Sequence, residues 1–237
     1  MRALAQSEAR CCGAPSSLAS MPLSNYAKDK YVAPQMSKFT AASIRDMSAT
    51  SAEQEHWLMN FVLNTLLRVN IEERVQQTLF NFLRRTESAF REYSLARDRT
   101  LAYLSNADAV SDYIAAIAHW EVFLSHSYQA YCLLARKQQV LFKKGDGSVL
   151  ERLNLLYNRS KHADGAIEAG QLPEDATMGI WLTNDGLRST DSWLTFDEMA
   201  EALEEIARWS DAAQDPLTMR EKLMLKIAEA AEDDAVS

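Results

Sequence analysis

Glycine and proline are scarce in this 237-residue chain, which holds seven glycines and five prolines. Turn-rich β architectures use both residues in their loops, so the scarcity favours long helices over a sandwich or a barrel. Apolar residues make up 47% of the sequence, yet no apolar run approaches the ~20 residues that a membrane-spanning helix needs. We therefore expect a mainly helical protein that does not enter a membrane.

Cysteine is also scarce, and the signatures of several enzyme classes are missing. Three cysteines cannot form a disulfide framework, so a reducing, cytoplasmic setting fits best. The sequence contains no glycine-rich phosphate loop, H-E-x-x-H, paired C-x-x-C or G-x-S-x-G. These absences count against a P-loop nucleotide enzyme, a zincin, a zinc ribbon and an α/β-hydrolase, and we expect neither a metal nor a cofactor.

Charge is unevenly divided along the chain, whose formal net charge is -8. Residues 166–237 carry 5 basic and 17 acidic side chains, so this part of the sequence repels nucleic acid. Residues 51–165 are nearly neutral, but lysines and arginines gather between Lys143 and Lys161. We expect any contact with RNA in that cluster.

The periodicity of apolar residues divides the chain into three segments. Residues 1–48 are rich in Ala and Ser and show no sustained period, which predicts a poorly ordered leader; Met21 and Met36 within it are alternative start sites. Residues 49–165 repeat apolar residues at three- and four-residue steps, which predicts an antiparallel bundle of long helices. Residues 166–237 are expected to pack on this bundle as a β-hairpin or irregular insertion followed by acidic helices.

Local signals predict where these elements begin and end. Helices are expected from about residue 50, from 72 to 104 and from 108 to 142. Ser148 with Glu151, and Thr195 with Glu198, match the capping box that opens a helix. Three further signals are a helix end at Asp164-Gly165, a turn at residues 184–186 between two short strands, and a last helix opening at Asp215-Pro216.

The candidate site lies in the sequence LNLLYNRSKH at residues 153–162. Asn154, Asn158 and His162 recur every four residues, so a helix places them on one face. Histidine has an unperturbed pKa near ~6.5, so His162 is suited to general acid–base cleavage of RNA without a metal. Arg159 or Arg152 would stabilise the transition-state charge, and Asn158 would orient the imidazole or the phosphate.

Two further points concern the surroundings of this helix. Its polar residues also fit an ordinary solvated face, with His162 placed favourably at the negative end of the helix dipole and Lys161 in solvent. Glu121 falls on the apolar stripe of the preceding long helix, so it is predicted at or near the core. A buried carboxylate needs a partner, for which Arg152, Arg159 and His162 are the candidates.

Long antiparallel helices followed by a short helix ending in N-x-x-x-H resemble HEPN domains, helical bundles of RNA-cleaving toxins and defence proteins. The family's active motif is an Arg, a polar residue that is often Asn, three to five residues and then a His. Asn158 and His162 match the last two, but Tyr157 stands at the Arg position. The resemblance covers roughly residues 55–165. It implies a homodimer, because active members commonly bring two motifs together across an interface.

The resemblance includes inactive members that act as binding modules, and Tyr157 in place of the phosphate-contacting Arg favours that role. We therefore expect a HEPN-like protein that binds RNA or a partner protein, in bacterial defence or a toxin–antitoxin pair. The residues expected to line the binding surface are Asn154, Arg152, Lys161, Tyr157 and Glu121. The alternatives are a metal-independent endoribonuclease that uses His162, Asn158 and Arg159, and a scaffold whose acidic C-terminal helices recruit a basic partner.

Overall fold

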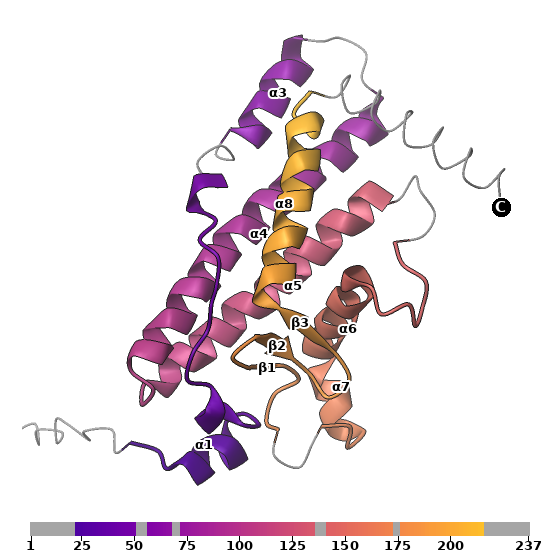
Figure 1. Ribbon diagram of the computed structural model, residues 1–237. Coiled ribbons are helices and arrows are strands. Elements are labelled where there is room, and N and C mark those ends of the chain that lie inside the picture. The colour runs from indigo at the N-terminus through magenta and orange to yellow at the C-terminus, as the bar shows by residue number, and fades with distance from the viewer. Residues whose placement is uncertain (1–21, 51–55, 68–71, 136–140, 173–175, 216–237) are drawn as a thin grey trace, which may run out of the picture.

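A computed structural model describes residues 22–50, 56–67, 72–135, 141–172 and 176–215 of the chain. Within these residues the protein is a helical bundle with one small antiparallel sheet before its last described helix, as the sequence predicts (Figure 1). No helix among them is long and apolar enough to cross a membrane.

Two long antiparallel helices form the centre of the fold, α4 (Glu73–Ser105) and α5 (Val110–Ala135). They pack against each other over most of their length (Figure 1). The predicted helix from 108 to 142 is too long at its C-terminal end, because α5 ends at Ala135 and residues 141 and 142 are not helical. Residues 136–140 lie outside the described residues.

Helices α3 (Trp57–Leu67) and α8 (Phe196–Ala213) pack against this pair. The predicted capping box of α8 is confirmed: the Thr195 hydroxyl accepts from the Glu198 N–H, and the Glu198 carboxylate accepts from the Thr195 N–H. Part of the start of the helix predicted from about residue 50 falls at residues 51–55, outside the described residues, as does the helix predicted from Pro216.

Helix α6 (Val149–Lys161) crosses α5 and is followed by the short α7 (Ala163–Glu168). Ser148 caps α6 as predicted, but the Glu151 carboxylate accepts from two N–H groups of the preceding turn instead of completing the box. The helix end predicted at Gly165 is wrong, since α6 ends at Lys161 and Gly165 lies within α7.

The predicted hairpin is present and has a third strand. Strands β1 (Trp181–Leu182), β2 (Gly186–Arg188) and β3 (Trp193–Thr195) form an antiparallel sheet in that order. Position 186 requires glycine, because a Cβ atom there would lie 1.9 Å from the carbonyl oxygen of Leu194 on β3. Gly186, at the predicted turn, therefore allows β2 and β3 to approach each other closely.

The predicted disorder of the leader is wrong for residues 22–48. They form α1 (Asn25–Tyr31), the 3-10 helix η1 (Met36–Lys38) and an extended segment that runs beside α4 (Figure 1). Apolar side chains of residues 22–48 are buried, namely Val32, Ala33, Met36, Phe39, Ile44 and Met47. Extended chain buries apolar residues at irregular steps, so no helical period marks it. Residues 1–21 lie outside the described residues.

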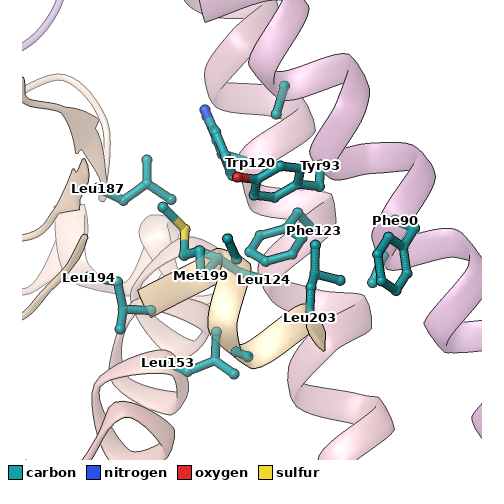
Figure 2. Packing of buried hydrophobic residues seen from close by; sticks show 14 of the residues in the cluster. Phe90, Tyr93, Trp120, Phe123, Leu124, Leu153, Leu187, Leu194, Met199 and Leu203 are labelled. Atoms are coloured by element: carbon teal, nitrogen blue, oxygen red, sulfur yellow. The ribbon is translucent and has the colours of Figure 1, made fainter. Parts of the chain in front are cut away.

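One core joins all of these elements. Figure 2 shows side chains from α4, α5, α6, α8 and the sheet meeting at its centre. Tyr93 of α4 packs edge-to-face against Trp120 of α5 at 5.4 Å between ring centroids. Leu153 brings α6 into the same cluster, so the orientation of the helix that carries the candidate site is fixed by core packing.

Candidate functional site

The arginines of α6 face the sheet and α8, away from solvent. Arg152 reaches the Glu198 carboxylate with both terminal nitrogens, at 3.1 and 2.5 Å, and donates to the carbonyl oxygens of Trp193 and Gly147. Its guanidinium also lies 5.4 Å from the Trp193 ring centroid. Arg152 therefore joins α6, β3 and α8, and its side chain is only 15% exposed.

Arg159 lies two turns further along the same face and is also engaged. Its terminal nitrogens reach Asp191 at 2.9 Å and Gln171 at 3.4 Å, and its side chain is 16% exposed. An arginine that is already paired with a carboxylate in a fixed geometry is a poor phosphate ligand. The structure thus places both predicted phosphate contacts, Arg152 and Arg159, in structural ion pairs.

The opposite face of α6 turns toward α5 and solvent. Asn154 and Asn158 share this face as predicted, and the Asn158 side-chain amide donates to the Asn154 side-chain oxygen at 2.9 Å. Tyr157 stacks on Tyr128 of α5, with ring centroids 5.2 Å apart. The Lys161 ammonium lies 5.7 Å from the centroid of the Tyr157 ring. Tyr157, Lys161 and the two asparagines are therefore brought together.

His162 stands at the end of this face, as the C-cap of α6. Its backbone N–H bonds to the Asn158 carbonyl oxygen, but its side chain is exposed and makes no hydrogen bond with any residue of the described chain. An imidazole that acts as a general acid or base is normally held by a second group. Nothing in the described residues holds His162 in that way.

Glu121 does not pair with any of its predicted partners. The side chain is half-buried, and the hydroxyl of Ser160 donates to its carboxylate. Burial raises the pKa of Glu121, and the hydrogen bond from Ser160 offsets part of that rise. The predicted ion pair with Arg152, Arg159 or His162 is wrong, because the two arginines extend from α6 to the side away from α5.

The lysines of the predicted cluster are also separated. Lys143 and Lys144 lie in the exposed turn before α6, and Lys161 lies in the last turn of that helix. The cations that the sequence places within about 20 residues therefore do not form one patch. The positive charge near Tyr157 comes from Lys161 of the same helix and from Arg85 of α4.

A ladder of three polar pairs runs along the contact between α4 and α5. Successive members are seven residues apart on both helices, so they repeat on one face of each. The pairs are Arg99–Asp112 at 3.1 Å, Glu92–His119 at 2.8 Å and Arg85–His126 at 3.0 Å. The first two pairs contain a carboxylate, and the Arg85–His126 pair does not.

Arg85 is the cation that this ladder leaves without a counter-charge. Burial and the neighbouring Arg84 lower the pKa of its guanidinium, and the interaction with Tyr157 opposes them. Arg85 forms no ion pair with a carboxylate in the part of the chain that the structure describes, and neither does Lys161, which lies over the Tyr157 ring. The seven-residue spacing of Arg85, Glu92 and Arg99 is visible in the sequence and could have indicated a common face. Their partners on α5 could not be predicted, because the register between the two helices is not visible in the sequence.

The described residues contain no group of three or more His, Cys, Asp or Glu side chains that could hold a metal ion. Comparisons with protein-family models, with curated proteins and with solved structures find no match to this chain. Function is therefore inferred from the chemistry of the site.

Proposed function

We propose that the protein is an RNA-binding module with a HEPN-like helical arrangement. The contact surface would be the basic face, which we define as Arg84 and Arg85 of α4, His126 of α5, and Tyr157 and Lys161 of α6. The role is binding and not cleavage. A cytoplasmic location, a homodimer and a place in bacterial defence or a toxin–antitoxin pair remain predictions that follow from the sequence.

The observation that carries the proposal is the uncompensated charge beside Tyr157. The Lys161 ammonium lies 5.7 Å from the centroid of its ring, and Arg85 interacts with it electrostatically; neither cation has a carboxylate partner among the described residues. Other arginines of the fold are paired with carboxylates, namely Arg45, Arg97, Arg99, Arg152 and Arg159. Phosphate groups supply the charge that is missing here, and their neutralisation drives RNA affinity.

The aromatic pair favours RNA over a purely acidic protein as the ligand. Tyr157 and Tyr128 are stacked, and both are half-buried, so part of each side chain is accessible, with Lys161 over the Tyr157 ring. Cations combined with aromatic rings are typical of surfaces that bind single-stranded nucleic acid, where bases stack and phosphates pair with Lys or Arg. An acidic protein could bind through the cations alone and would not use the aromatic rings.

The acidic remainder of the molecule would orient the ligand. Helix α8 carries Asp197, Glu198, Glu201, Glu204 and Glu205. Arg45 and Arg152 pair with four of these carboxylates, but the helix itself is acidic and repels a polyanion, so RNA binding would be confined to the basic face. Catalysis has weaker support, because His162 is exposed and unoriented and Arg159 is paired with Asp191.

A binding experiment tests the proposal. A fluorescent single-stranded RNA is titrated with the full-length protein at 50 and 200 mM salt in the presence of EDTA, and the RNA is afterwards examined for cleavage. We expect binding that weakens at the higher salt and an intact RNA. The absence of binding at both salt concentrations, with the protein folded, would contradict the proposal.

A further inference from the structure

We propose that Arg85 and His126 form a phosphate subsite within the basic face, and that binding of phosphate is coupled to protonation of His126. The inference rests on the proposed function for its biological ligand, an RNA phosphate. Its physical test does not require RNA, because a small inorganic anion probes the same two side chains.

The geometry defines the hydrogen in the Arg85–His126 contact. An arginine terminal nitrogen lies 3.0 Å from Nδ1 of His126. Guanidinium nitrogens only donate, so Nδ1 must accept, and the neutral imidazole then carries its proton on Nε2. In this state His126 is neutral, and Arg85 is the one full positive charge of the pair.

The other two pairs of the ladder indicate that the Arg85–His126 pair lacks a negative charge. Glu92 supplies the negative charge of the middle pair, and Asp112 supplies that of the pair with Arg99. The third pair, Arg85 with His126, contains no carboxylate. An RNA phosphodiester bound there would supply one negative charge, as the single carboxylate does in each of the other two pairs.

Protonation would change which hydrogen bonds the His126 imidazole can make. The imidazolium has two N–H groups and no acceptor, so it cannot accept from Arg85, and two cations then lie side by side. A bound phosphate accepts from both and removes the repulsion. Phosphate should therefore favour the protonated His126, and by linkage protonation should strengthen the binding of phosphate by the same factor.

The groups around His126 determine the direction in which its pKa is shifted before an anion binds. Burial and Arg85 lower the pKa of His126, Glu92 raises it, and Arg84 and Arg91 lower it further. These charged neighbours all come from α4; from α6, Tyr157 interacts with Arg85, and the Lys161 ammonium lies 5.7 Å from the Tyr157 ring centroid. The free protein thus holds His126 neutral at pH 7, and binding of an anion opposes this effect.

The experiment follows the imidazole of His126 by NMR in the full-length protein, with sulfate as the probe. Sulfate keeps its charge between pH 5 and 8, whereas inorganic phosphate itself titrates in that range. At constant ionic strength, replacing chloride with sulfate is expected to raise the pKa of His126. The affinity for sulfate is expected to rise by up to ~10-fold per pH unit as the pH falls, the limit for uptake of one proton.

Three variants separate the subsite from other effects. His126→Asn keeps an oxygen that can accept from Arg85 but does not titrate, so sulfate binding should lose its pH dependence. Arg85→Ala should abolish the effect of sulfate on His126. His162→Ala removes a histidine outside the subsite and should leave both effects unchanged.

Two results would overturn the inference: a pKa of His126 that sulfate does not change, or the same pH dependence of sulfate binding in His126→Asn as in the natural protein. Either result leaves the proposed function standing if RNA still binds to the basic face. Failure of RNA binding alone, with the sulfate effect present, would reject the RNA function and retain the anion subsite.

Discussion

Arg152 of α6 and Glu198 of α8 form a two-pronged ion pair, with nitrogen–oxygen distances of 3.1 and 2.5 Å. Burial by itself raises the pKa of Glu198, but the hydrogen bonds from Arg152 and Thr195 bring it below its usual value. The pair joins two helices that are distant in sequence. Arg152 therefore acts in stability, although the sequence assigns it to a binding site.

Replacing Arg152 with Ala is predicted to destabilise the protein. The change leaves the Glu198 carboxylate partly buried without its counter-charge, which costs on the order of 2–3 kcal/mol. Denaturant unfolding measures the loss. RNA affinity of the folded variant should stay within about twofold of the natural protein, since Arg152 does not belong to the basic face. A tenfold loss of affinity in a fully folded variant would return Arg152 to the binding site.

Glu121→Gln is predicted to stabilise the protein at neutral pH. Burial raises the folded-state pKa of Glu121 above its usual 4.5. Folding is therefore opposed by the charged carboxylate as the pH rises through that folded-state pKa, and the penalty is absent below about pH 4.5. Gln keeps an acceptor for Ser160 and carries no charge.

The measurement for Glu121→Gln is the free energy of unfolding at pH 7 and at pH 4. The variant should exceed the natural protein at pH 7, and the difference should disappear at pH 4. A less stable variant at pH 7 would mean that the carboxylate has a cationic partner after all.

His126→Asn is predicted to remove part of the acid sensitivity of the fold. Burial and Arg85 depress the folded-state pKa of His126 below its usual 6.5. The unfolded chain therefore binds a proton first, so stability falls as the pH drops from 6.5 through the folded-state pKa. The slope of unfolding free energy against pH in that window should be smaller in His126→Asn. Equal slopes in the two proteins would show that His126 titrates as in the unfolded chain.

His162→Ala is predicted to be nearly silent. The side chain is exposed and makes no hydrogen bond in the described residues, so its loss should change stability by no more than about 0.5 kcal/mol. Thermal unfolding measures this change. A mixed RNA pool incubated with the natural protein in EDTA should stay intact. Cleavage that disappears in His162→Ala would contradict the binding role and establish a metal-independent ribonuclease.

The fold was largely predictable because its signals are local. The apolar spacing of Ile117, Leu124 and Tyr131 marks the buried face of α5, although Ile114 of the same predicted stripe is exposed. The Thr195–Glu198 capping box marks the start of α8. The packed segment at 22–48 was missed, because extended chain without a partner strand leaves no period in the sequence.

The site was predicted less well, because it depends on which way each face of α6 points. The spacing of Asn154 and Asn158 places them together, as observed. It cannot reveal that Arg152 and Arg159 turn to carboxylates that follow them by 46 and 32 residues. Nor can it reveal the pairing of Arg85 with His126, which requires the antiparallel register of two long helices.

RNA binding by the basic face is tested most directly by comparing three proteins. They are the natural protein and two variants that each carry two substitutions. Arg85→Ala with Lys161→Ala removes the two uncompensated cations beside Tyr157. Arg74→Ala with Arg188→Ala removes two exposed arginines outside the basic face. Circular dichroism first establishes that both variants are folded.

Fluorescence anisotropy with a short single-stranded RNA then gives the affinity of each protein as a function of salt. We expect at least a ~10-fold loss of affinity and a shallower salt dependence for Arg85→Ala with Lys161→Ala, and less than a twofold change for the control. Equal affinity and equal salt dependence in all three proteins would contradict the basic face as the RNA-binding surface.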